Sequence, residues 1–150
     1  MISFKATGYF YEDFEIGAEV NSPGRTISDA DVDMFLDWTG APSRDSSVQT
    51  APRSLLVNLA DMLMQRIGIV EGTGYCNLGW SWAFREHVNI GDTIWLRAVW
   101  TDKRESTRTE GVGIVSMEIE MVNQADQIVA TATWAVMILM RDKPAAWRTA

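Results

Sequence analysis

The residues that could do chemistry gather in the segment 40–54. Asp45 lies in a polar loop beside Arg44, and Arg53 and Ser54 open an apolar helical pattern. A loop carboxylate can act as a general base that activates water. An arginine at a helix N-terminus can hold a carboxylate or phosphate, because the backbone amides and the helix dipole favour anions there. We therefore predict a site with Asp45 as the catalytic base and with Arg44, Arg53 and Ser54 as substrate-binding residues.

Each of these residues also has a purely structural interpretation. Asp45 could be a solvated loop carboxylate paired with Arg44, and Arg53 could be an ordinary surface residue. His87, the one histidine of the chain, lies at an expected strand end, and Cys76 alternates with apolar residues as a core cysteine does. No His, Cys, Asp or Glu cluster has metal-ligand spacing, so the sequence predicts neither a metal site nor a Ser/His/Asp triad.

Two helices must position this segment. Ser28 and Asp31 form a capping-box-like start and Gly40 suits the position after a helix end, so one helix is expected between them. A second helix is expected over 52–67. It is apolar around most of its circumference, which predicts that other elements largely enclose it. Its one polar stripe, which would serve as a pocket wall or an interface, consists of Ser54, Asn58, Asp61 and Gln65.

The second half of the chain changes to a period of two, the alternation of half-buried antiparallel strands. Residues 25–27 predict a short strand, and the polar residues 102–110 predict a connection. The sequence thus predicts an α+β fold in which one antiparallel sheet wraps around the long helix. A single domain would span residues 1–150, with an extended N-terminal segment (1–24) and a tail (141–150). The long strands are expected at 76–85, 94–100, 115–121 and 128–140.

Composition narrows the class of partner. A net charge of −7 argues against nucleic acid, which needs clustered Lys and Arg to neutralise phosphates. No segment approaches the roughly 20 apolar residues of a membrane helix. The N-terminus lacks a signal-peptide pattern and the single cysteine allows no internal disulfide, so we expect a cytoplasmic protein. Basic stretches at 103–108 and 141–148 could still hold the phosphates of a small ligand.

Several short motifs carry a family resemblance: Tyr11–Gly17, Arg25–Val32, Thr39–Gly40, Ala51–Leu56 and Val88–Thr93. In order and spacing they resemble the MaoC-like dehydratase family of hot-dog proteins, which includes the (R)-specific enoyl-CoA hydratases. The resemblance implies a hot-dog fold and an acyl-CoA ligand with no further cofactor. It also implies a homodimer or higher oligomer that binds the thioester at a subunit interface. A backbone N–H near Arg53 would polarise the thioester carbonyl.

The chain departs from that family in one loop. Family members use an Asp and a His five residues apart as paired acid and base groups on one water. The matching positions here are Ala41 and Ser46, of which the first has no titratable group and the second is no base near neutral pH. Starting the motif at Asp45 instead places Thr50 in the His position. The resemblance therefore implies the family fold without its usual acid–base pair.

Three functions remain open on this reading. The chain could be an enoyl-CoA hydratase or dehydratase of fatty acid metabolism with a reworked site that uses Asp45. It could be a non-catalytic partner in a hetero-oligomer whose related chain supplies the missing Asp and His. It could also be a hot-dog acyl-CoA thioesterase in which Asp45 activates the attacking water.

Overall fold

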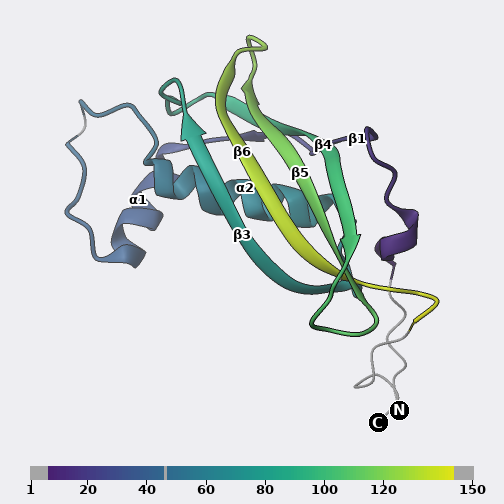
Figure 1. The fold of residues 1–150 in the computed structure, drawn as a ribbon. Coiled ribbons are helices and arrows are strands. Elements are labelled where there is room, and N and C mark those ends of the chain that lie inside the picture. The colour runs from purple at the N-terminus through teal and green to yellow at the C-terminus, as the bar shows by residue number, and fades with distance from the viewer. Residues whose placement is uncertain (1–6, 46, 144–150) are drawn as a thin grey trace.

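The computed structural model describes residues 7–45 and 47–143, and its centre is a curved sheet of six antiparallel strands around one long helix (Figure 1). The strand order is β1-β4-β5-β6-β3, and β2 also pairs with β4. All the pairings are antiparallel, as the alternation of apolar and polar residues predicts. The strands are β1 (Glu19–Asn21), β2 (Arg25–Thr26), β3 (Gly74–Phe84), β4 (Thr93–Glu105), β5 (Val112–Asn123) and β6 (Ile128–Leu139).

Three helical segments accompany the sheet: η1 (Tyr11–Asp13), α1 (Asp29–Thr39) and α2 (Arg53–Ile67). The capping box that the sequence predicts for α1 is present. The Ser28 hydroxyl accepts the backbone N–H of Asp31 at 3.2 Å, and the Asp31 carboxylate accepts that of Ser28 at 2.8 Å. Gly40 ends α1 with a φ of 67°, a left-handed conformation that glycine adopts without steric cost.

The core lies between α2 and the inner face of the sheet. Leu56, Ala60, Leu63 and Met64 are the buried residues of α2. The opposite side of the helix is open, and Met62 there is 53% exposed. The expectation of a largely enclosed α2 is therefore wrong for the single chain, because the sheet covers one side of the helix only.

The N-terminal half of β3 departs from regular alternation. The register to β6 shifts between Gly74 and Cys76 and again between Asn77 and Gly79. These bulges turn Leu78 outward, where it is 48% exposed, and Cys76 is exposed as well. The core interpretation of Cys76 is therefore wrong, because each extra residue in a bulge reverses which face the following side chains occupy.

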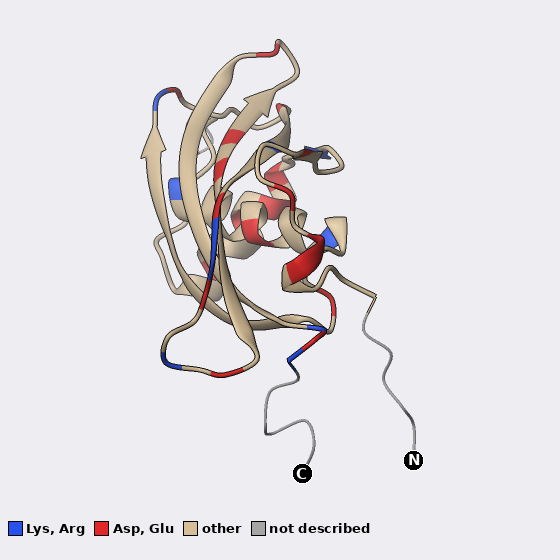
Figure 2. Cartoon of the chain, turned by 45° about the vertical axis from the view of Figure 1, so that its right-hand side comes forward, with Lys and Arg blue, Asp and Glu red and all other residues tan. Residues whose placement is uncertain are grey.

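The charged side chains are distributed over separate elements. Figure 2 shows Lys and Arg on several loops and strand ends rather than in one patch, and acidic residues on η1 and other helices. Much of the sheet carries neither positively nor negatively charged residues. No helix in the described part of the chain is both long enough and apolar enough to span a membrane.

Candidate functional site

The loop between α1 and α2 lies at the C-terminal end of β3. The backbone N–H of Ala51 donates to Val88 at 2.8 Å, and that of Ile90 donates to the Gln49 carbonyl at 2.8 Å. The start of α1 is held to the same segment, because Ile27 donates to Asp92 at 2.9 Å. The loop and both helix N-termini therefore meet around residues 88–92, just beyond the last residue of β3.

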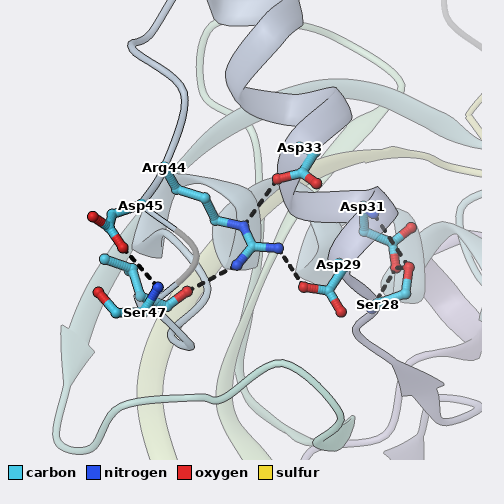
Figure 3. A network of polar contacts seen from close by, with 8 residues as sticks. Ser28, Asp29, Asp31, Asp33, Arg44, Asp45 and Ser47 are labelled. Atoms are coloured by element: carbon cyan, nitrogen blue, oxygen red, sulfur yellow. Dashed lines mark hydrogen bonds and ion pairs between the residues drawn. The ribbon is translucent and has the colours of Figure 1, made fainter.

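Arg44 ties this loop to α1 (Figure 3). Its Nε donates to Asp33 at 2.9 Å, Nη1 donates to the Val48 carbonyl at 2.9 Å, and Nη2 forms an ion pair with Asp29. The Arg44 side chain is only 12% exposed. The pKa of its guanidinium is raised, first by the hydrogen bond to Asp29. Arg44 thus braces the loop against the acidic face of α1, so the alternative interpretation in which Asp45 pairs with Arg44 is wrong.

Asp45 points away from α1 on the other side of the loop (Figure 3). It is exposed, and its Oδ1 accepts the backbone N–H of Ser47 at 2.8 Å. Hydrogen bonds from Ser47 lower the pKa of the Asp45 carboxyl, so it is ionised at neutral pH. Ala41 is half-buried, and Ser46 lies outside the described residues. A catalytic role for Asp45 remains a prediction.

The N-terminus of α2 is the candidate anion-binding point. Pro52 is its N-cap residue and provides no side-chain hydrogen bond to the first turn. The guanidinium of Arg53 lies 5.3 Å from the ring centroid of Phe84, the last residue of β3. Backbone amides of an uncapped first turn point toward any group placed there, and the helix dipole favours negative charge at that end. Ser54 is exposed on the same turn.

An aromatic stack leads from the core to this point. Trp80 stacks on Trp134 with centroids 4.8 Å apart and planes at 9°, and Trp82 follows at 5.6 Å and 15°. Phe84 completes the stack at 5.8 Å and 22°. Sequence reasoning missed this arrangement because it depends on the pairing of β3 with β6, although the alternate aromatic residues of β3 were the available signal. The Nε1 of Trp82 is buried without a hydrogen-bond partner.

The basic stretches expected to hold phosphates make contacts within the chain. Lys103 donates to the Phe14 carbonyl at 2.7 Å. Arg141 pairs with Asp13 at 2.5 Å, and Lys143 pairs with Glu105 at 2.9 Å. Residues 144–150 lie outside the described part of the chain.

Among the remaining candidates, His87 directly precedes Val88, whose carbonyl accepts the backbone N–H of Ala51 at the end of the loop. His87 is exposed. Burial raises the pKa of Asp61, which lies in the polar stripe of α2. Within residues 7–45 and 47–143, no group of three His, Cys, Asp or Glu side chains is placed to hold a metal ion.

Comparison with solved structures identifies the fold. The MaoC-like dehydratase from Rhodospirillum rubrum matches with a TM-score of 0.77 and 18% identity, over 89% of this chain and 99% of that one. The HadBC (3R-hydroxyacyl-ACP dehydratase) complex from Mycobacterium tuberculosis matches with a TM-score of 0.65 and 16% identity, over 81% and 96%. A further M. tuberculosis protein, described as a double hotdog fold, matches with a TM-score of 0.75 and 15% identity, over 91% and 46%.

The chain therefore has the hot-dog fold that the sequence predicted, with an antiparallel sheet wrapped on a central helix. Other structural matches include (R)-hydratases and a hypothetical thioesterase solved with coenzyme A. No protein-family model matches the sequence, and no curated protein matches it significantly. At these identities the similarity defines the fold, whereas the activity has to be argued from the site.

Proposed function

We propose that the protein is a MaoC-like hot-dog protein that binds an acyl-CoA thioester with its carbonyl at the N-terminus of α2. The observation that carries this proposal is the first turn of α2, which has no side-chain cap and lies beside the loop that follows α1. Backbone amides there can stabilise the negative charge that develops on a thioester oxygen. The fold similarity to dehydratases and (R)-hydratases supports the same ligand class.

Arg53 would act on the charged part of the ligand. Its guanidinium already lies over the Phe84 ring, which fixes its position without using its hydrogen-bond donors on another side chain. A guanidinium forms strong bidentate bonds with phosphate, so Arg53 is suited to a CoA phosphate next to the first turn of α2.

Hydration or dehydration by this chain would have to proceed without the Asp and His that MaoC-like dehydratases use as acid and base. Addition of water to an enoyl thioester needs a group that takes a proton from water and one that returns a proton to the substrate. Asp45 is the ionisable side chain of the loop that could accept a proton, and its lowered pKa makes it a weak base. A reworked hydratase with Asp45 as base therefore predicts slow turnover.

A second candidate function is that of a non-catalytic partner. It is favoured by the position of Arg44, which holds the loop through Asp29 and Asp33, and by the absence of a titratable group at Ala41. Such a chain would complete the acyl slot of a related chain that carries the Asp and His. The HadBC dehydratase, solved as a complex, is a structural precedent for more than one kind of chain in one enzyme.

We also propose that two copies associate along β3. This strand has β6 on one side and lies at the edge of the sheet. An edge strand presents unpaired backbone groups that a second strand can use. Leu78 of β3 is exposed at this edge and Met62 is exposed on α2, and we expect the second copy to cover both side chains.

One set of measurements separates these functions. Purified protein is mixed with crotonyl-CoA, and loss of the conjugated thioester is followed together with release of free CoA thiol. Loss of the conjugated bond indicates a hydratase, and its abolition by Asp45→Ala identifies the base. Release of thiol without hydration indicates a thioesterase, and its loss in Asp45→Ala would identify Asp45 as the residue that activates water.

Binding without turnover is tested with butyryl-CoA, a saturated thioester. We expect Arg53→Ala to weaken its binding about tenfold, the effect of losing roughly 1.4 kcal/mol from a charge-assisted contact. Arg97→Ala, on β4 where the arginine pairs with Glu120 and Asp126, is the control and should leave the affinity unchanged. If the wild-type protein binds neither thioester, the proposed function is wrong.

A further inference from the structure

The outer face of α1 is apolar and open. Met34 is 70% exposed and Trp38, one turn later, is 77% exposed, while Val32 is the one buried residue of the helix. The ring contact of Trp38 is with Phe35 of the same helix. Large apolar side chains that share one exposed face mark an interaction site, and an 11-residue helix needs such packing to be stable.

A hollow lies beside the N-terminal start of the edge strand β3. Its volume is about 220 Å³, enough for one aromatic side chain. Its lining combines the last turns of α2, the bulged part of β3 and the inner face of β6. Gln65, Val70, Tyr75, Cys76, Asn77 and Trp134 are among the residues that line it. We call it the β3 hollow.

Two-fold symmetry would bring these two features together. In a pair joined along β3, the two copies of this strand run antiparallel, so the start of one lies beside the end of the other. The start of α1 and the end of its loop are fixed to residues 88–92, beyond the end of β3, whereas the β3 hollow lies at its start. Gln65, near the C-terminal end of α2, lines the hollow, whereas Figure 1 shows α1 near the N-terminal end of that helix.

Resting on the proposed β3 pairing, we propose that Trp38 of one copy inserts into the β3 hollow of a second copy. Charged residues beside the two features also favour a second copy of this chain as the occupant of the β3 hollow. Asp37 is exposed on α1 next to Trp38, and Arg66, which follows the lining residue Gln65 in the sequence, is exposed on α2. The end of α1 in one copy would thereby be anchored to the other copy.

The natural cysteine of the hollow makes this contact measurable. Cys76 is the single cysteine of the chain and is exposed. We expect Trp38→Cys, treated with a short bismaleimide, to give a covalent dimer on reducing gels, with the cross-link between positions 38 and 76 identified by peptide mass spectrometry. Glu19→Cys, on the opposite edge of the sheet, is the matched control and should remain monomeric on the gel.

Two further measurements test whether Trp38 lies in the β3 hollow and whether it stabilises the dimer. The double variant Trp38→Cys with Cys76→Ser should lose the cross-link, and a cross-link that persists places Trp38 against another surface and overturns the proposal. Trp38→Ala should weaken self-association in sedimentation at least several-fold with an unchanged far-ultraviolet spectrum, because the side chain is exposed in the single chain. A dimer that forms equally well with Trp38→Ala, or a purely monomeric wild type, also overturns it.

These outcomes are independent of thioester binding. Cross-linking and sedimentation are measured without ligand, so a failure of butyryl-CoA to bind contradicts the proposed function and leaves the docking of Trp38 to be judged on its own data. Capture of Trp38 by a different chain would appear as a cross-link to a peptide that this sequence does not contain, and that result contradicts the second copy as occupant.

Discussion

The Nε of Arg44 donates a 2.9 Å hydrogen bond to Oδ1 of Asp33, which joins the loop after α1 to the exposed face of that helix. The same guanidinium pairs with Asp29 one turn earlier. Residues 29, 33 and 44 therefore fix the loop in place before any ligand arrives.

Arg44→Ala should release the loop without unfolding the protein. We expect amide hydrogen exchange over residues 40–50 to become several-fold faster, because the bonds to Asp33, Asp29 and the Val48 carbonyl are lost together. Arg97→Ala removes a comparable pair of ion pairs on the sheet and serves as the control. Unchanged exchange in the loop of Arg44→Ala would contradict the bracing role.

Asp31 should make stability depend on pH at the acid end. The Ser28 backbone N–H, then its hydroxyl, and Arg25 lower the pKa of the folded-state carboxyl. The stabilisation is thus complete above the unfolded-state pKa of 3.8 and is lost as the pH falls through the lower folded-state pKa. Asp31→Asn should therefore be less stable than wild type at about pH 6, with the difference shrinking toward about pH 3. Urea unfolding at both values tests this.

Gly113 should tolerate no side chain while Tyr11 is in place. A Cβ at Gly113 would overlap the Tyr11 ring, which packs η1 on β5. We expect Gly113→Ala to lower the free energy of unfolding by about 1–3 kcal/mol, as overpacking does. In a double-mutant cycle with Tyr11→Ala, the combined cost should be smaller than the sum of the two single costs. Strictly additive costs would show that the overlap does not govern the effect.

Asn77 should stabilise the bulged start of β3. Its Oδ1 accepts the Gly79 backbone N–H at 2.9 Å and the Trp134 Nε1 at 3.0 Å. Asn77→Ala leaves the buried indole donor without a partner, which should cost roughly 1–3 kcal/mol in denaturant unfolding. Asn77→Asp retains an acceptor and should recover most of that loss. Equal destabilisation by both variants would show that the hydrogen bond is not what Asn77 contributes.

The sequence by itself determined the two long helices with their ends, and the approximate positions of the long strands. Ser28, Asp31 and Gly40 predicted both ends of α1 to within a residue, because caps act through bonds a few residues apart. The alternation of apolar and polar residues predicted the long strands because it, too, is a local pattern. β4 was underestimated, since its polar end, Asp102–Glu105, pairs with β5 only after a register shift at Trp100. That part of the strand is held by its neighbour rather than by its own pattern.

The tertiary structure alone decided what the candidate site is made of. Arg44 bonds Asp29 and Asp33, eleven and more residues away, instead of the adjacent Asp45, because the loop folds back over α1. The stack of Trp80 on Trp134 exists because the first long strand pairs with the last. Local spacing carries no information about such pairings, since they arise from chain reversals that bring distant segments together. The exposure of Trp38 and Cys76 likewise depends on which distant segments cover them, so local spacing could not predict it.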